Sequence, residues 1–399
     1  MPYISCHAAH TIAENQTNDR RAGMKKRILA VLTIFVAAMV LQLTAACAWA
    51  QQPTELSAVS AILIEAETGT VLYQKNADEK RAMASTTKIM TAILTIEAGD
   101  LDSEFTVDSC AIMVEGTSMG LREGDRVSRR DLLYGILLPS GNDAANAAAV
   151  SVGGSIGGFV ELMNKKAQEL GLSSTHFVTP SGLDANGHYT TARDLAMLTA
   201  YAMRNETFRD IVSCSSAEVE FGNPPYARTL YNSNKMLKRY EGAIGVKTGF
   251  TDNARRCLVS AAQRGGVTLI AVTLSASDDW NDHEKMLDCG FAAVESFPLQ
   301  LECAERVSVA GTGENVGVYA DPASLALLPQ QAQKLTKRVL LPRFVYGGVK
   351  KGDRLGCIEF SLDGRVVKTC PLYAAESVKA ECGELSPLQK LLAAVGIYI

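Results

Sequence analysis

A short apolar segment near the start of the chain constrains the fold most. Residues 91–98 are rich in Ile, Leu and Ala, and Gly99 follows them. An apolar helix has to be enclosed by other elements, and a glycine just after the last residue is a common C-terminal cap. We therefore expect a buried helix that ends at this glycine.

Ser85 and Lys88 stand just before this helix, three residues apart. If Ser85 opens the helix, both side chains lie on one face, one turn apart, at the positive end of the helix dipole. A serine becomes a good nucleophile only beside a base, and a lysine withdrawn from water can be that base at neutral pH. The pair alone is a common pattern, because a serine that caps a helix beside a surface lysine fits the same letters.

Two hairpins and several helices are predicted around this segment. Residues 58–65 and 71–74 are predicted to form two strands joined by a turn. Residues 257–262 and 267–274 are predicted to form a second such hairpin. Helical patterns lie between the hairpins, at residues 127–133, 144–150, 159–170 and 193–203, with Ser128 and Thr191 as N-caps. We expect an α+β fold in which a helical cluster packs on one antiparallel sheet, with Ser85 at the junction.

The C-terminal part has a different character. From about residue 297, short apolar strands are separated by Gly, Pro and Asp, which predicts a small all-β domain. The last residues, from Ser386, place Leu388, Leu391, Leu392, Val395 and Ile399 on one stripe. As a helix this stretch spans roughly 21 Å, too short to cross a bilayer. We expect it to lie on the membrane surface, although docking on its own domain is the alternative.

The N-terminal residues resemble a secretory leader rather than part of a fold. Lys25, Lys26 and Arg27 precede an apolar run at 28–41, and Ala48-Trp49-Ala50 forms a cleavage signal. These features predict a signal peptide that begins at Met24 and is cleaved after Ala50. A retained membrane anchor and lipid attachment at Cys47 are the alternatives. The predicted organisation is a leader and extension at 1–50, a catalytic domain at 51–296, a β-domain at 297–384 and an amphipathic helix at 385–399. We expect the exported chain to act at the outer face of the cytoplasmic membrane.

Charge and cysteine content exclude some classes of partner. The chain carries a net charge of −4, and the leader holds more basic than acidic residues, so nucleic acid is not an expected partner. The cysteines form no C-x-x-C pair and few histidines remain after the leader, so a structural zinc site is not expected. We expect no cofactor. Cys357, Cys370 and Cys382 are close enough in sequence to pair in an exported protein, but cysteines in apolar strands are also simply buried.

Two further polar motifs and one misleading match follow Ser85. Ser140-Gly141-Asn142 interrupts two helical patterns, so it predicts a loop that presents both polar side chains to one side. Lys247-Thr248-Gly249 lies in a β-type run, where a glycine often marks the close approach of another backbone or a ligand. Residues 153–157 match the letters of the G-x-S-x-G nucleophile elbow, but no strand precedes them, so we interpret them as a loop.

The order and spacing of the three motifs are more specific than any one of them. Ser85-Thr86-Thr87-Lys88, Ser140-Gly141-Asn142 and Lys247-Thr248-Gly249 resemble the ordered triplet of the penicillin-recognising serine acyltransferases. In detail the chain is similar to the D-alanyl-D-alanine carboxypeptidases, whose strand reads Gly-x-Lys-Thr-Gly followed by Thr-Asp, as at residues 245–252. The likeness covers roughly residues 55–295 and continues into the β-domain and the tail.

The resemblance implies a β-lactamase/transpeptidase-like fold and a serine enzyme that removes the terminal D-alanine from peptidoglycan pentapeptide stems through an acyl-enzyme. β-Lactam antibiotics are the implied covalent inhibitors. Ser85 is the implied nucleophile, Lys88 its base and Ser140 the proton relay. The implied substrate-binding residues are Asn142, Lys247, Thr248, Gly249 and Phe250, with the backbone N–H groups of Ser85 and Phe250 as the oxyanion hole.

Some features separate this hypothesis from its rivals. A serine β-lactamase shares the triplet, but the class A enzymes hydrolyse the acyl-enzyme through a glutamate on a loop, and residues 171–193 contain no glutamate. An inactive wall-binding module is expected to have lost Ser85, Lys88 or Lys247.

A D,D-endopeptidase uses the same residues, so the sequence leaves this alternative open. Some relatives carry an arginine after the last sheet strand, where this chain has none, and Arg255 or Arg256 is a candidate substitute.

Overall fold

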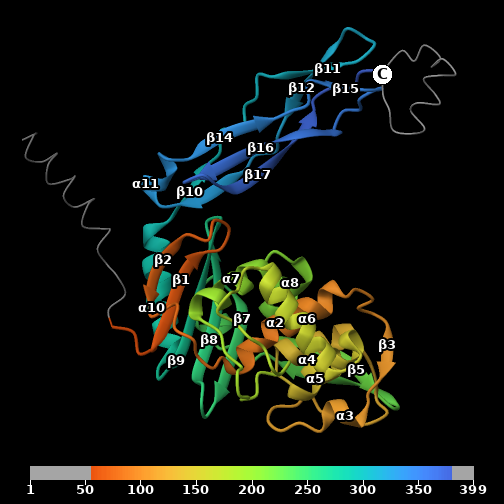
Figure 1. Ribbon diagram of the computed structural model, residues 1–399, viewed down its shortest axis with the longest axis vertical. Coiled ribbons are helices and arrows are strands. Elements are labelled where there is room, and N and C mark those ends of the chain that lie inside the picture. Colours follow the sequence, from red (N-terminus) through yellow and green to blue (C-terminus); the bar gives the residue numbers. More distant parts are fainter. Residues whose placement is uncertain (1–54, 380–399) are drawn as a thin grey trace, which may run out of the picture. The chain divides into compact units, whose positions relative to one another are not determined.

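The computed structural model describes residues 55–379. In the part of the chain that contains the longer helices, the helices pack on a five-stranded antiparallel sheet in the order β2-β1-β9-β8-β7 (Figure 1). The strands are β1 (Ser60–Glu65), β2 (Val71–Lys75), β7 (Ala243–Thr251), β8 (Arg255–Arg264) and β9 (Val267–Ala276). Both predicted hairpins are confirmed, and they join because β1 pairs along its whole length with β9.

Apolar side chains cover both faces of this sheet. Ile62 on β1 and Val272 on β9 are register partners and belong to the core beneath the helical cluster. Leu63 and Ala271, one residue along, face the opposite side and pack with α10 (Asp279–Ala293). Because side chains alternate along a strand, a sheet buried on both faces needs apolar residues at successive positions. Figure 1 shows α10 and the helical cluster on opposite sides of the sheet.

The helical cluster surrounds α2 (Lys88–Glu97), in which residues 88–96 are all buried. This confirms the predicted central helix, and Gly99 follows it with a φ of 73°. One detail differs: Ser85 lies in a 3-10 turn, η2 (Ala84–Thr87), and the α-helix begins only at Lys88. The other helices are α3 (Ser109–Ile112), α4 (Arg129–Leu137), α5 (Asn142–Gly153), α6 (Ile156–Glu169), α7 (Ala192–Ala202), α8 (Glu206–Ser213) and α9 (Met236–Arg239).

Side-chain caps begin several of these helices. The hydroxyls of Ser128 and Thr191 accept hydrogen bonds from the backbone of α4 and α7, as predicted. Ser155 does the same for α6, which therefore begins three residues before the predicted Phe159. The serine of the elbow-like letters is thus a helix cap between two helices.

A second sheet was not predicted. It has the order β3-β4-β5-β6, formed by β3 (Glu104–Thr106), β4 (Arg126–Ser128), β5 (Ser216–Gly222) and β6 (Pro225–Tyr231). The expected helical cluster on an antiparallel sheet is present, but this additional sheet was missed. Its strands β5 and β6, seven residues each, were not recognised, and β3 and β4 are only three residues long. Strands this short show no alternating pattern in a sequence.

The predicted all-β domain is confirmed at the C-terminal side. β10 (Glu295–Pro298) pairs with β13 (Ser324–Leu327), and a six-stranded sheet has the order β14-β16-β17-β12-β11-β15. Its strands are β11 (Arg306–Val309), β12 (Asn315–Tyr319), β14 (Thr336–Leu340), β15 (Phe344–Val345), β16 (Arg354–Leu362) and β17 (Arg365–Ala374), with one helical turn, α11 (Pro329–Ala332).

A disulfide between Cys357 and Cys370 is excluded. Cys357 pairs with Pro371, and Cys370 pairs with Ile358, so the two cysteines are offset by one residue on neighbouring strands. An offset of one places the side chains on opposite faces of the sheet, and both thiols are free.

Several predictions lie outside the described residues: the signal peptide, Cys47, Cys382 and the amphipathic helix at 385–399. Within residues 55–379, no helix combines the length and the apolar character needed to cross a membrane. The domain boundaries given above stay predictions.

Candidate active site

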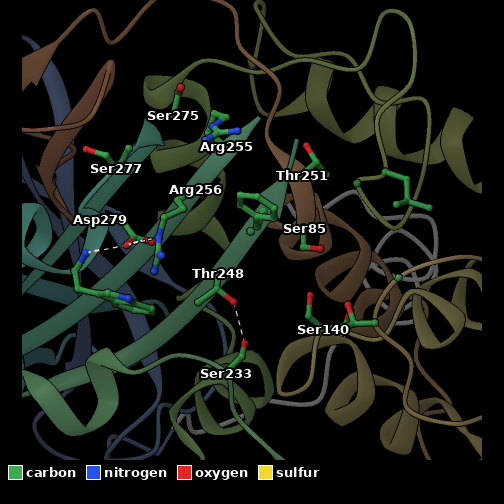
Figure 2. A pocket seen from close by; sticks show the side chains of 18 of the residues that line it. Ser85, Ser140, Ser233, Thr248, Thr251, Arg255, Arg256, Ser275, Ser277 and Asp279 are labelled. Atoms are coloured by element: carbon green, nitrogen blue, oxygen red, sulfur yellow. Dashed lines mark hydrogen bonds and ion pairs between the residues drawn. The ribbon is translucent and has the colours of Figure 1, made fainter. Parts of the chain in front are cut away.

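A cleft of about 1020 Å³ brings the three sequence motifs together. Ser85, Ser140 and Thr248 line it from the first, second and third motif, and Figure 2 shows their hydroxyl groups around one space. Asn142, Gly249 and Phe250 line it too. Two predicted site residues, Lys88 and Lys247, are not in its lining: both are buried, with exposures of 0% and 1%.

The Lys88 amine lies against the Ser85 hydroxyl. The Lys88 Nζ is 2.9 Å from Ser85 Oγ, 2.7 Å from Asn142 Oδ1 and 2.6 Å from the Ser181 carbonyl oxygen. The alternative of a helix cap beside a surface lysine is therefore wrong. All three motifs were predicted to meet, but the Ser181 carbonyl was missed because a backbone acceptor in a loop leaves no residue-type signal.

Both buried lysines have lowered pKa values. Burial lowers the pKa of Lys88 well below its usual range, and the charge of Lys247 lowers it further. Burial alone lowers the pKa of Lys247 to about 7. The expected effect of a second cation on Lys88 is thus confirmed in direction, with withdrawal from water as the larger cause.

The second motif is held in an uncommon backbone conformation. Ser140 has a φ of 69°, in the left-handed region that non-glycine residues seldom adopt. Its Oγ is buried and has no hydrogen-bond partner in the described protein. Asn142 opens α5, and its amide nitrogen donates to the Glu115 carbonyl at 2.6 Å while its oxygen accepts from Lys88. The motif therefore ends one helix and begins the next with two polar side chains on the cleft.

A carboxylate behind the motif fixes the facing loop. Asp143 is 2% exposed and accepts hydrogen bonds from the Ser118 hydroxyl and from the backbone N–H groups of Met119, Gly120 and Leu121. The sequence analysis did not find this role, because the partners lie more than twenty residues away and are mostly backbone groups.

The third motif crosses the start of η2. A Cβ placed on Gly249 would lie 3.1 Å from the Ser85 nitrogen and 3.2 Å from the Thr86 nitrogen. The absence of a side chain at Gly249 thus allows the strand to approach this turn closely, as its position in a strand suggested. The Thr248 hydroxyl faces the cleft and lies 2.9 Å from Ser233 Oγ, another residue that the sequence analysis missed (Figure 2).

Two arginines, Arg255 and Arg256, also line the cleft. Arg256 forms an ion pair with Asp279 at 3.0 Å, and Arg255 has a φ of 59° (Figure 2). The sequence named both as substitutes for a missing arginine. The structure places both on the cleft but gives only Arg256 a carboxylate partner.

The loop at 180–183 presses on the nucleophile segment. A Cβ on Gly182, whose φ is +85°, would overlap the Ala84 carbonyl oxygen. Gly187 has nearly the same φ of +86°, but its Cβ would have no neighbour closer than 3.9 Å. Replacing either glycine with alanine therefore carries a similar backbone strain, but only at Gly182 would the added Cβ clash with a neighbour.

We expect Gly182→Ala to destabilise the protein by about 2 kcal/mol more than Gly187→Ala, because overpacking adds to the left-handed backbone strain. Urea unfolding of both variants measures the difference. Gly182→Ala is also expected to slow acylation of Ser85, because Ala84 must shift. Equal free energies of unfolding for the two variants would show that the loop is not packed as described.

Comparisons with known proteins identify the family of the chain. Residues 47–278 match the family model described as D-alanyl-D-alanine carboxypeptidase, and residues 304–380 match the one described as penicillin-binding protein 5, C-terminal domain. D-alanyl-D-alanine carboxypeptidase DacF of Bacillus subtilis is 33% identical, over 89% of this chain and 95% of its own length. DacC of Escherichia coli is 34% identical, over 83% and 87%.

Solved structures give the same result. The Streptomyces K15 DD-transpeptidase is 37% identical, with a TM-score of 0.58, over 60% of this chain and 99% of its own. D-alanyl-D-alanine carboxypeptidase DacD from Francisella tularensis is 26% identical, with a TM-score of 0.58, over 83% and 95%. The chain belongs to the D-alanyl-D-alanine carboxypeptidase family of serine peptidases.

Proposed function

We propose that Ser85 is the nucleophile with which this carboxypeptidase removes the terminal D-alanine of peptidoglycan pentapeptide stems. The observation that carries the assignment is the fully buried Lys88 amine, 2.9 Å from Ser85 Oγ. Ser85 Oγ attacks the carbonyl carbon of the penultimate D-alanine, and its proton passes to Lys88. The C–N bond then breaks, D-alanine leaves as an amine, and water hydrolyses the ester on Ser85.

The contacts of Lys88 support its role as the base. A neutral amine has two hydrogens and one lone pair. Asn142 Oδ1 and the Ser181 carbonyl can only accept, so they take the two hydrogens. The lone pair is then left for the Ser85 hydroxyl, which donates to it. The same three contacts can also accept the three hydrogens of an ammonium, so the contacts permit the neutral form and the lowered pKa favours it.

Ser140 and the third motif supply the remaining roles. The Ser140 Oγ has no hydrogen-bond partner in the described protein, so it is available to pass a proton to the leaving amine. The Thr248 hydroxyl and the charge of Lys247 behind it suit the terminal carboxylate of the substrate, with Arg255 as a further cation on the cleft. The N–H groups of Ser85 and Phe250 are the proposed oxyanion hole.

These assignments predict a bell-shaped dependence of kcat/KM on pH. The acid limb reports the loss of a proton from Lys88, which must be neutral to act. The alkaline limb begins near pH 7, where Lys247 becomes neutral, because the carboxylate then loses the charge behind Thr248. Above that pH, kcat/KM should fall by about tenfold per unit. In Lys247→Arg the cation persists, so we expect the alkaline limb to move above pH 9; a limb at the same pH in both enzymes would contradict the role of Lys247.

Mass spectrometry tests the function directly. The chain from residue 51 is incubated with benzylpenicillin and, separately, with a diacyl-Lys-D-Ala-D-Ala tripeptide. We expect a lasting penicilloyl adduct on the Ser85 peptide and free D-alanine from the tripeptide, with neither in Ser85→Ala. Rapid loss of penicillin without an adduct would instead indicate a β-lactamase. A folded sample that gives neither product would refute the enzymatic assignment.

The acceptor of the acyl group is a separate question. The Streptomyces relative is named a DD-transpeptidase, and a transpeptidase passes the acyl group to an amine instead of water. Adding glycine to the tripeptide reaction distinguishes the two, since transfer gives a new peptide product. Cross-linked dimeric stems test the endopeptidase alternative in the same way.

We also propose that the enzyme acts outside the cytoplasmic membrane. The leader-like residues 24–50 and the location of peptidoglycan support this compartment. Protease protection in spheroplasts, with N-terminal sequencing of the mature chain, tests export and the cleavage after Ala50.

A further inference from the structure

One end of the β-domain exposes aromatic side chains. Phe344 and Tyr346 are 49% and 57% exposed, and their rings meet edge to face at 5.2 Å. They lie on and just after β15, which pairs with β11 at the edge of the six-stranded sheet. Figure 1 shows β11, β12 and β15 gathered at this end of the domain. We call the residues 343–354 and 374–379 the aromatic end.

The aromatic end is rigidly supported. Val349 and Val378 exchange two backbone hydrogen bonds, of 2.8 and 2.9 Å, which tie together the two segments that form it. Both side chains are buried in a small apolar cluster with Val307, Val309 and Val316. The two segments of the aromatic end are therefore anchored to a packed core, in which Val345, between the two rings, takes part.

Basic side chains surround the two rings. Exposed cations of the aromatic end are Arg343, Lys350, Lys351, Arg354 and Lys379. Its carboxylates are fewer: Glu376 is paired with Arg306 at 2.8 Å, and Asp353 accepts from the backbone of Lys350. An amphipathic mixture of aromatic rings and cations suits the interface of an anionic bilayer, where rings sit at headgroup level and cations meet phosphates.

The sequence that follows the aromatic end contains a stripe of apolar residues, which also suits a membrane surface. Lys379 is the last described residue, and six residues separate it from the apolar stripe that begins at Ser386. A linker of that length spans at most about 20 Å. If the stripe lies on a membrane, the aromatic end is therefore held close to the same surface.

We propose that the aromatic end is a lipid-contacting surface, in which Phe344 and Tyr346 enter the interface of an anionic bilayer and the surrounding cations contact its phosphates. This surface acts together with the C-terminal stripe and is separate from the catalytic cleft. Two points of contact with a membrane restrict the orientation of a domain more than one point of contact does.

A tryptophan reporter tests the contact. The chain from residue 51 contains one tryptophan, Trp280, which lines the catalytic cleft and serves as the internal background. Phe344→Trp places a reporter on the aromatic end, and Tyr231→Trp places one on β6 of the catalytic part, at a side chain that is 70% exposed. Each protein is titrated with phosphatidylglycerol–phosphatidylethanolamine vesicles that contain brominated lipid. We expect quenching and a blue shift for Phe344→Trp only.

A second measurement determines how much the surface contributes. In co-sedimentation with the same vesicles, Phe344→Ser/Tyr346→Ser should bind about tenfold more weakly than the parent, and Tyr231→Ser should bind equally well. Vesicle binding without quenching of Phe344→Trp would overturn the proposal, since the tail then acts alone. Binding to insoluble peptidoglycan that the double variant loses, without any binding to vesicles, would overturn it in favour of a wall-binding surface. Tripeptide hydrolysis in solution, assayed in parallel, reports separately on the catalytic function.

Discussion

Lys88→Arg is expected to slow acylation of Ser85 by benzylpenicillin by about 10³-fold, the contribution of a well-placed general base. A guanidinium stays protonated at every accessible pH, so it can hold a charge beside Ser85 but cannot take its proton. The Lys88 site is fully buried and favours a neutral amine. Stopped-flow acylation, or the rate at which the penicilloyl adduct forms, measures the change.

A matched control separates lost chemistry from lost structure. Lys165→Arg makes the same substitution on the exposed surface of α6 and should leave the acylation rate and the melting temperature unchanged. Lys88→Met removes the base while keeping the apolar stem, and it should be as inactive as Lys88→Arg. If Lys88→Arg acylated within a few-fold of the parent while folding normally, the base would have to be another group.

Much of this site was accessible from the sequence because its polar residues stand in short motifs. Ser85 and Lys88 are neighbours on one helical turn, so their spacing allows a contact, and the family resemblance was needed to prefer that contact over a helix cap beside a surface lysine. The meeting of that turn with Asn142 and Thr248 also depended on the family resemblance, because contacts across fifty or more residues leave no local signal. The same reason explains why the Ser181 carbonyl and the loop held by Asp143 were missed: their partners are backbone groups.

In the fold, too, elements with strong local patterns were predicted, and elements that depend on distant contacts were missed. The hairpin at β1 and β2 and the central helix α2 were predicted, because alternation and an apolar run are strong local patterns. The helix α6 was predicted with a late start, since Ser155 was not recognised as its cap. β3 and β4 are stabilised by neighbours distant in sequence rather than by their own residues, so three-residue strands could not be found.

The strained serine of the second motif links stability to function. Ser140 has a left-handed backbone and a buried hydroxyl without a partner. Each feature costs free energy: the conformation about 1–2 kcal/mol in a non-glycine residue, and the unpaired hydroxyl a further part of its desolvation. A fold under selection for stability alone would place glycine here. The serine is explained if its free hydroxyl is needed in the reaction.

Ser140→Gly should therefore be more stable than Ser140→Ala by about 1 kcal/mol, because glycine adopts the left-handed conformation without strain and alanine does not, with part of the gain lost to the greater freedom of the unfolded chain. Both variants lack the hydroxyl, so both should lose about 10²-fold in kcat for the tripeptide, in the range of a lost proton relay. Urea unfolding and D-alanine release, measured on the same preparations, separate the two effects. If Ser140→Gly kept full activity, the hydroxyl would not carry the proton, and the strain at Ser140 would need another cause. If instead the Ser140→Gly and Ser140→Ala variants had equal free energies of unfolding, the left-handed backbone at Ser140 would not destabilise the protein.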